Sequence, residues 1–277
     1  MWHRRMVARR AARGQLTGWA GAVTSAIALG AGAAHAQHAI SVDSIPGTLV
    51  TFELVAVPGG QVSVDSAGRM VTVEVAPFLI GRTEVTWDAY DVFAFRLDQR
   101  AAQPPGADAV ARPSRPYGAP DWGFGHRGYP AMSVTREAAK AYCVWLSAKT
   151  GRRYRLPTEA EWAHAAALAY PSRAVSAEGV GDRSWGADNA DGRTHPVGTR
   201  VADALGLFDL LGNVAEWVQS LDGARIVRGG SYRDAGLTPE ARAKQNSRWN
   251  ETDPQIPKST WWLSDGPFVG IRIVRER

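Results

Sequence analysis

The sequence predicts one mixed α+β domain with little regular secondary structure, preceded by an export signal. Three observations indicate this fold class. Segments with helical periodicity are few, runs typical of strands are short, and Gly and Pro recur among them from residue 171 onward. About 240 residues follow the signal, which is enough for one large domain with a substantial core.

The first 36 residues have the composition of a secretory signal peptide. Five arginines and no acidic residue occupy residues 1–15, and an uncharged run rich in Ala and Gly follows over residues 16–34. The run ends in Ala34-His35-Ala36, the A-x-A pattern that precedes signal-peptide cleavage. We therefore expect residues 1–36 to be removed and residues 37–277 to form a periplasmic or secreted domain. An uncleaved signal would leave that domain anchored to a membrane.

The charge of the domain itself is balanced. The chain has 32 basic and 27 acidic residues, and five of the arginines belong to the export signal, so 27 of each sign remain. No basic face is therefore indicated, and we expect no nucleic-acid partner. After residue 37 no apolar run is long enough to span a bilayer, so we expect no membrane contact beyond the signal.

The expected strands are short and the first of them form a hairpin. Residues 48–57 and 61–75 are predicted strands, with a turn at residues 65–68 inside the second run. Further short strands are expected at residues 205–211, 225–227 and 268–274.

Three helices have start or stop signals. Thr86 is a predicted N-cap for a helix through residue 97, and Thr135 begins a helix that Gly151 ends after residue 150. Thr158 and Glu161 form a capping box at the start of the third. Residues 98–121 contain five prolines and are expected to form a loop within the domain.

Five motifs, in a fixed order, resemble those of the formylglycine-generating enzyme (sulfatase-modifying factor) family. Together they extend over nearly the whole predicted domain. The resemblance implies the formylglycine-generating-enzyme fold, related to C-type lectin folds: a single mixed α+β domain with low regular secondary structure. The motifs are Ile80-Gly81-Arg82-Thr83-Glu84-Val85-Thr86, Tyr154-Arg155-Leu156-Pro157-Thr158-Glu159-Ala160-Glu161-Trp162, Gly206-Leu207-Phe208-Asp209 with Gly212-Asn213-Val214-Ala215-Glu216-Trp217, Arg228-Gly229-Gly230-Ser231-Tyr232 and Phe268-Val269-Gly270-Ile271-Arg272.

The family's reaction requires thiols that this chain lacks. The resemblance implies oxidation of a sulfatase cysteine by oxygen at copper(I). A pair of cysteines located between the last two motifs binds this ion, since a soft ion prefers thiolates. Here residues 233–267 contain no cysteine, so formylglycine formation is not expected. The single cysteine, Cys143, lies on the second predicted helix, either as a reactive thiol or, as we favour, as a buried apolar group.

The resemblance also implies a structural calcium site. Asp209 and Glu216 would supply carboxylate oxygens, and Gly212 and Val214 would supply backbone carbonyls. In the alternative, Glu216 pairs with an arginine and Asp209 caps a turn. Asn189, with its two following residues, is a weaker candidate for a second calcium ion.

Iron and copper are not expected. Some relatives are non-haem iron enzymes, but His126, His164 and His195 form no His-x-His or His-x-x-x-His pair. The facial triad of such enzymes is therefore not supported by the spacing.

The segment that replaces the cysteine-bearing stretch is rich in tryptophan. Arg248, Trp249, Trp261 and Trp262 are candidates for a ligand groove, because exposed aromatic rings beside an arginine can hold a peptide or sugar. Buried packing is the alternative. Two functions stay open: a calcium-stabilised binding or accessory domain for a peptide, protein or glycan, or a metal-dependent oxidoreductase (non-haem iron or copper) of the same superfamily acting on a peptide or secondary metabolite.

Overall fold

The computed structural model describes residues 38–99, 112–113, 118–171 and 180–277. The predicted export signal and most of the proline-rich loop lie outside these residues. Within them, no helix is both long and apolar enough to cross a bilayer.

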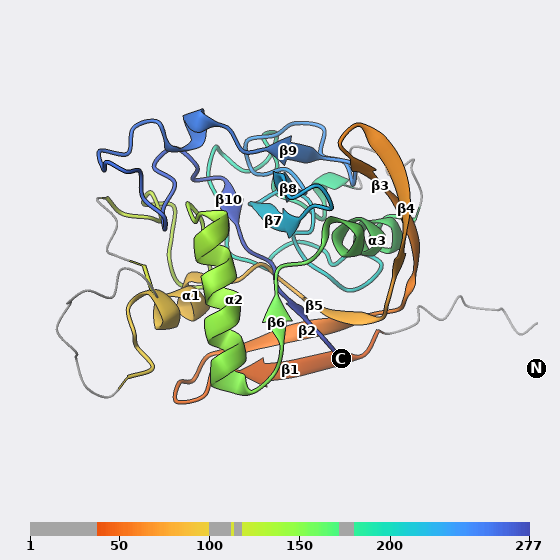
Figure 1. Ribbon diagram of the computed structural model, residues 1–277, viewed down its shortest axis with the longest axis horizontal. Coiled ribbons are helices and arrows are strands. Elements are labelled where there is room, and N and C mark those ends of the chain that lie inside the picture. Colours follow the sequence, from red (N-terminus) through yellow and green to blue (C-terminus); the bar gives the residue numbers. More distant parts are fainter. Residues whose placement is uncertain (1–37, 100–111, 114–117, 172–179) are drawn as a thin grey trace, which may run out of the picture. The chain divides into compact units, whose positions relative to one another are not determined.

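Three antiparallel or mixed sheets form the β part of the domain (Figure 1). The largest has the order β1-β2-β5-β11-β6, so the C-terminal strand β11 is inserted between β5 and β6. The second has the order β10-β7-β8-β9, with β10 parallel to β7, and the third is the β3-β4 hairpin. The strands are β1 (Ile40–Ser44), β2 (Thr51–Val57), β3 (Gly60–Ser66), β4 (Arg69–Val75), β5 (Phe78–Gly81), β6 (Tyr154–Arg155), β7 (Ala215–Gln219), β8 (Arg225–Arg228), β9 (Arg242–Lys244), β10 (Val269–Gly270) and β11 (Val274–Arg275).

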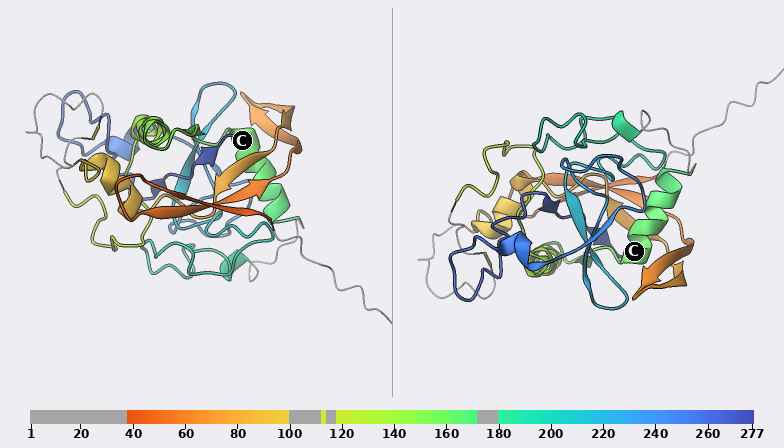
Figure 2. Two further views of the ribbon diagram at one scale, coloured as in Figure 1. Left: turned by 90° about the horizontal axis from the view of Figure 1, so that it is seen from below. Right: turned by 90° about the horizontal axis from the view of Figure 1, so that it is seen from above.

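Three α-helices and one short 3₁₀ helix accompany the sheets. Figure 2 shows α1 and α3 at opposite ends of the sheets, with α3 packed against the β3-β4 hairpin. The helices are α1 (Trp87–Ala94), α2 (Arg136–Thr150), α3 (Glu159–Ala169) and η1 (Ser247–Asn250).

The predicted helix signals are confirmed in the two longer helices. The Thr135 hydroxyl accepts a hydrogen bond from the Ala138 N–H, and Gly151 ends α2 in the left-handed conformation with φ 70°. In α3, Thr158 and Glu161 bond each other's backbone N–H groups, as a capping box requires. These local signals therefore set both helices in place.

Three sequence predictions need correction. Helix α1 ends at Ala94 and not at residue 97, because Arg96 takes a left-handed conformation with φ 59° that turns the chain away. Residues 205–211 form turns and not a strand, because Gly206 and Asp209 have φ 84° and 52° and the Asp203 carboxylate ties the local backbone. The predicted strand at residues 48–57 begins only at Thr51, after a turn.

The core forms two clusters of buried apolar residues. One gathers α1, α2 and most of the tryptophans, and the other joins the inner face of α3 to β2 and β5. Aromatic rings in the first cluster meet mostly edge to face or tilted, as with Phe93 and Tyr142. Since the single cysteine allows no intrachain disulfide, packing of this kind holds the domain together.

Candidate functional site

A fully buried arginine lies where the family-like motifs meet. The Arg272 side chain is 0% exposed, and its Nε donates to Glu216 Oε1 at 2.7 Å. Its two terminal nitrogens donate to the carbonyl oxygens of Gly81 and Phe208, both at 2.8 Å. Two of the five motifs therefore contact the single guanidinium of a third.

Glu216, from β7, is the principal partner of this arginine. Its second oxygen, Oε2, accepts a hydrogen bond from Trp162 Nε1 of α3 at 2.7 Å. Burial raises the pKa of the Glu216 carboxyl, and the charge of Arg272 and the indole hydrogen bond act against that rise. The structure thus shows the arginine pair that was the alternative to calcium for this residue.

Glu84 is a second buried acid, which the sequence did not single out. It is 2% exposed, and its carboxylate receives the Val214 N–H at 3.3 Å and the Asn213 side-chain amide at 3.4 Å. Burial raises its pKa well above the ordinary value, and the nearby charge of Asp209 adds to the rise. Its position shortly after β5, inside the first family-like motif, was the available signal.

Asp209 completes the group. Its Oδ2 accepts a hydrogen bond from the Gly198 N–H at 2.7 Å, whereas Oδ1 is buried without a hydrogen-bond partner. Burial raises the pKa of this carboxyl to about 6. We call Glu84, Asp209, Glu216 and Arg272 the buried ionic centre. With all three acids ionised, one guanidinium leaves this centre with two uncompensated negative charges.

The other predicted calcium ligands lie on turns. Gly212 has φ 82°, and a Cβ there would lie 2.3 Å from the Trp185 carbonyl oxygen, so only glycine fits this close approach. The Asn189 amide is used locally, accepting from the Gly186 N–H and donating to the carbonyls of two neighbouring residues. Among the described residues, no group of three or more His, Cys, Asp or Glu side chains has the arrangement of a metal site.

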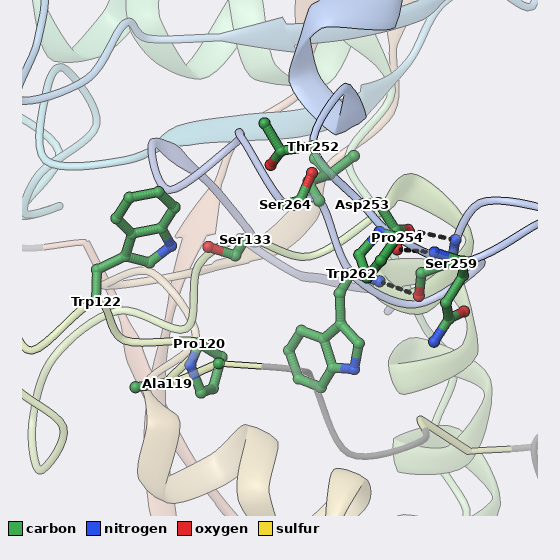
Figure 3. A pocket seen from close by; sticks show the side chains of 13 residues that line it. Ala119, Pro120, Trp122, Ser133, Thr252, Asp253, Pro254, Ser259, Trp262 and Ser264 are labelled. Carbon is green, nitrogen blue, oxygen red and sulfur yellow. Dashed lines mark hydrogen bonds between the residues drawn. The ribbon is translucent and has the colours of Figure 1, made fainter.

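A cavity of about 320 Å³ opens elsewhere, between the loop at residues 118–122 and the segment at residues 252–264. Figure 3 shows Trp122 and Trp262 on either side of Ser133, with the ring of Pro120 below. The lining residues are Gly118, Ala119, Pro120, Trp122, Ser133, Thr252, Asp253, Pro254, Gln255, Ser259, Trp262, Leu263 and Ser264.

Of the four predicted groove residues, the structure brings only Trp262 to this cavity. Trp249 and Trp261 are buried, at 8% and 6% exposure, and Trp249 packs edge to face on Phe268. Arg248 is exposed on η1. Buried packing therefore describes these tryptophans, and no common exposed face unites the four residues.

The segment of residues 233–267 nevertheless contributes to three hollows. Besides the cavity above, it lines one of about 450 Å³ beside β8 and β9 and one of about 600 Å³ beside η1. The segment in which the family resemblance places the cysteine pair thus lines cavities in this protein. We call residues 233–267 the wall segment.

The single thiol is inert in its setting. Cys143 lies on α2 in the first core cluster at 2% exposure, and burial raises its pKa to about 12. A buried, protonated thiol behaves as a small apolar group, as predicted.

His126, His164 and His195 each contact different residues. His126 has both ring nitrogens on carboxylates, at 2.7 Å from Asp91 and 3.0 Å from Asp121. His164 contacts the Pro58 carbonyl and His195 the Ala190 carbonyl. No two of them share a partner.

The fold and this centre define a class of protein: a mixed α+β domain in which family-like motifs that are distant in the sequence meet at one buried arginine. A family model described as "Sulfatase-modifying factor enzyme 1-like domain" matches residues 46–277. The chain belongs to this family, and the predicted resemblance and fold class are confirmed.

Relatives and a solved structure agree with this assignment. The chain is 36% identical over 150 residues to chaperone protein LppX of Paenibacillus barcinonensis, covering 45% of this chain and 50% of that protein. It is 30% identical over 151 residues to inactive C-alpha-formylglycine-generating enzyme 2 of Bos taurus, covering 45% and 46%. The matches thus span about half the length of these relatives. PvdO from Pseudomonas aeruginosa superimposes with a TM-score of 0.58 at 25% identity, over 86% of this chain and 98% of that one.

Proposed function

We propose that this protein is an exported binding or accessory domain that keeps the family's scaffold and lacks its oxidase chemistry. The observation that supports this proposal most directly is the burial of its only cysteine. Cys143 is buried in the core, its pKa is raised to about 12, and the wall segment supplies no cysteine. A peptide, protein or glycan would be held in a cavity that the wall segment lines.

The relatives support such a role without fixing its ligand. One similar protein is named an inactive formylglycine-generating enzyme and another a chaperone. Neither name implies an oxidase. Because the matches span only about half of each relative, the shared property we carry over is the scaffold.

The decisive experiment is an activity assay. Purified protein is incubated with oxygen, copper(I) and a sulfatase-type cysteine peptide, and the peptide is examined by mass spectrometry for the aldehyde. A formylglycine-generating enzyme that has its cysteine pair serves as the positive control. We expect no conversion, and the Cys143→Ala variant to be indistinguishable. Aldehyde formation by the wild type would overturn the proposal.

We further propose that calcium neutralises the buried ionic centre. Asp209 Oδ1 lacks a partner, and burial raises the pKa of all three acids around Arg272, so a bound cation would stabilise their ionised forms. Carboxylate oxygens are the ligands that calcium prefers, and each oxygen of Glu216 keeps a free lone pair beside its existing hydrogen bond. Asp209 and Glu216 would hold the ion together with backbone carbonyls of Gly212 and Val214.

Thermal unfolding tests the calcium proposal. A ligand that binds only the folded state stabilises it by about 2.7 kcal/mol at a hundred times its Kd. We expect calcium to raise the Tm of chelator-treated protein and Asp209→Asn to remove that response. Asp188→Asn, which changes an exposed acid, should retain it. An unchanged Tm in the wild type would exclude calcium from the centre.

A further inference from the structure

Two residues that line the 320 Å³ cavity have a backbone conformation that non-glycine residues avoid. Trp122 has φ 53° and Ser133 has φ 60°, both in the left-handed region. Such conformations cost about 1–3 kcal/mol each and cluster at ligand sites. For a residue as large as tryptophan the conformation is a clear outlier. Both left-handed residues therefore line one cavity.

Ser133 also presents an unsatisfied hydroxyl. The residue is 3% exposed, and its Oγ is buried without a hydrogen-bond partner. Its backbone is fixed because its carbonyl accepts the Leu263 N–H at 2.8 Å. A buried hydroxyl left unpaired costs about 1–3 kcal/mol, and a ligand group that both donates and accepts would satisfy it.

The described lining of the cavity contains one charged group. Asp253 is its only ionisable lining residue, and that carboxylate already receives the backbone N–H groups of Gln255 and Ser259 at 3.0 and 2.6 Å. The hydroxyls of Thr252 and Ser264 donate to Asp265, which leaves their lone pairs available as acceptors. Apart from this carboxylate, the polar part of the described lining consists of hydroxyls and the Gln255 amide.

The apolar part of the lining is made of flat rings. Trp122 is 48% exposed although it is a large apolar side chain, and its indole shares the cavity with that of Trp262. Pro120 adds a third ring from the same loop (Figure 3). Flat apolar faces next to neutral hydrogen-bonding groups suit a ligand whose ring has C–H faces and a hydroxyl rim.

We propose that this cavity binds one uncharged pyranose unit of a glycan. This inference rests on the proposed binding function and names its ligand class. An anionic group would find no counter-charge in the described lining, the oxygens of Asp253 already accept backbone N–H groups, and a purely apolar side chain would leave the Ser133 hydroxyl unpaired. A pyranose ring stacks on the indoles and exchanges a hydrogen bond with Ser133. The volume is at the lower end of small-ligand pockets and so suits a single ring.

Titration of neutral oligosaccharides tests the proposal. The probes are chitotetraose, cellotetraose, maltotetraose and mannotetraose, each followed by isothermal titration and by tryptophan fluorescence up to 10 mM. We expect at least one to bind, with Trp122→Ala weakening it about tenfold or more and Ser133→Ala about fivefold. Both variants are first checked by circular dichroism and thermal unfolding, so that loss of binding is separated from loss of fold.

Matched controls lie on the β3-β4 hairpin. Met70→Ala removes an exposed apolar side chain and Ser63→Ala an exposed hydroxyl, and neither should change the affinity. Failure of all four oligosaccharides to bind would overturn the proposal. Trp122-dependent binding of a proline-rich decapeptide in their place would also overturn it, yet would leave the binding function intact. Aldehyde formation on a cysteine peptide would instead refute the proposed function itself.

Discussion

The buried ionic centre and the wall segment satisfy their polar groups in opposite ways. In the centre, the fully buried guanidinium of Arg272 reaches partners from two distant motifs. In the wall segment, Asp253 and Asp265 accept hydrogen bonds from backbone and side chains of the segment itself. The comparison teaches that contacts between the family-like motifs specify the scaffold. The wall segment instead satisfies its acids within itself, so its sequence can change without disturbing the scaffold.

The largest effect is expected from removing the central guanidinium. Arg272→Met leaves Glu216 and its neighbouring acids buried without a counter-charge, and breaking a buried pair in this way costs about 3–5 kcal/mol. Urea unfolding followed by tryptophan fluorescence measures the loss.

An arginine of the wall segment provides the matched control. Arg248 is exposed, so Arg248→Met should change the free energy of unfolding by no more than about 0.5 kcal/mol. Similar values for the two variants would show that the centre and the walls do not differ in the way described.

A smaller effect is expected from the pH dependence of Asp209. Its pKa is about 6 in the folded protein, against an ordinary value of 3.8. A carboxyl whose folded pKa is raised contributes stability that is fully present below the unfolded pKa and is lost as pH rises through the folded one. Chelator-treated protein should therefore lose on the order of 2 kcal/mol through this residue between pH 4 and pH 7.

The comparison with Asp209→Asn isolates that contribution, because Asp203 has a similarly raised pKa and titrates in the same window. The difference in unfolding free energy between wild type and variant, measured by urea titration at each pH, should shrink when calcium is added. If this difference in unfolding free energy does not change from pH 4 to pH 7, groups outside the buried ionic centre neutralise the charge of the Asp209 carboxyl.

The sequence predicted the scaffold better than the walls, for physical reasons. The caps at Thr135 and Thr158 are local, so a few neighbouring residues suffice to place a helix end. The pairing of Arg272 with Glu216 joins residues 56 positions apart, and no local pattern shows that these two residues meet. The resemblance suggested Asp209 and Glu216 as ligands of one ion, which stays a prediction, and it did not single out Glu84.

The wall segment could not be predicted because burial of its tryptophans depends on distant partners. Trp262 packs on Trp87 and Tyr90 of α1, which no local pattern shows. Likewise, Trp122 and Ser133 take a left-handed backbone conformation that their residue types disfavour. Sequence reasoning misses such residues, which are expected at functional sites.

The smallest expected effect concerns how the cavity loop is attached. His126 stacks on Trp87 and joins Asp91 of α1 to Asp121 of the loop that carries Trp122. Burial alone lowers the pKa of His126, but the two carboxylates outweigh this and raise it. Both ring nitrogens donate only in the imidazolium form, so the contact is complete below the ordinary pKa of histidine and is lost as pH rises through the raised value.

Since the imidazole is partly exposed, its contribution to stability should stay below about 1 kcal/mol. Its effect should instead be local. Hydrogen exchange of the backbone amides at residues 121–128 should accelerate in the wild type between pH 6 and pH 8, after correction for intrinsic rates, and His126→Gln should be fast at both. If the loop amides of wild type and variant exchange alike at pH 6, the ion pairs do not fasten the loop, and the walls of the cavity are held by packing on Trp87 alone.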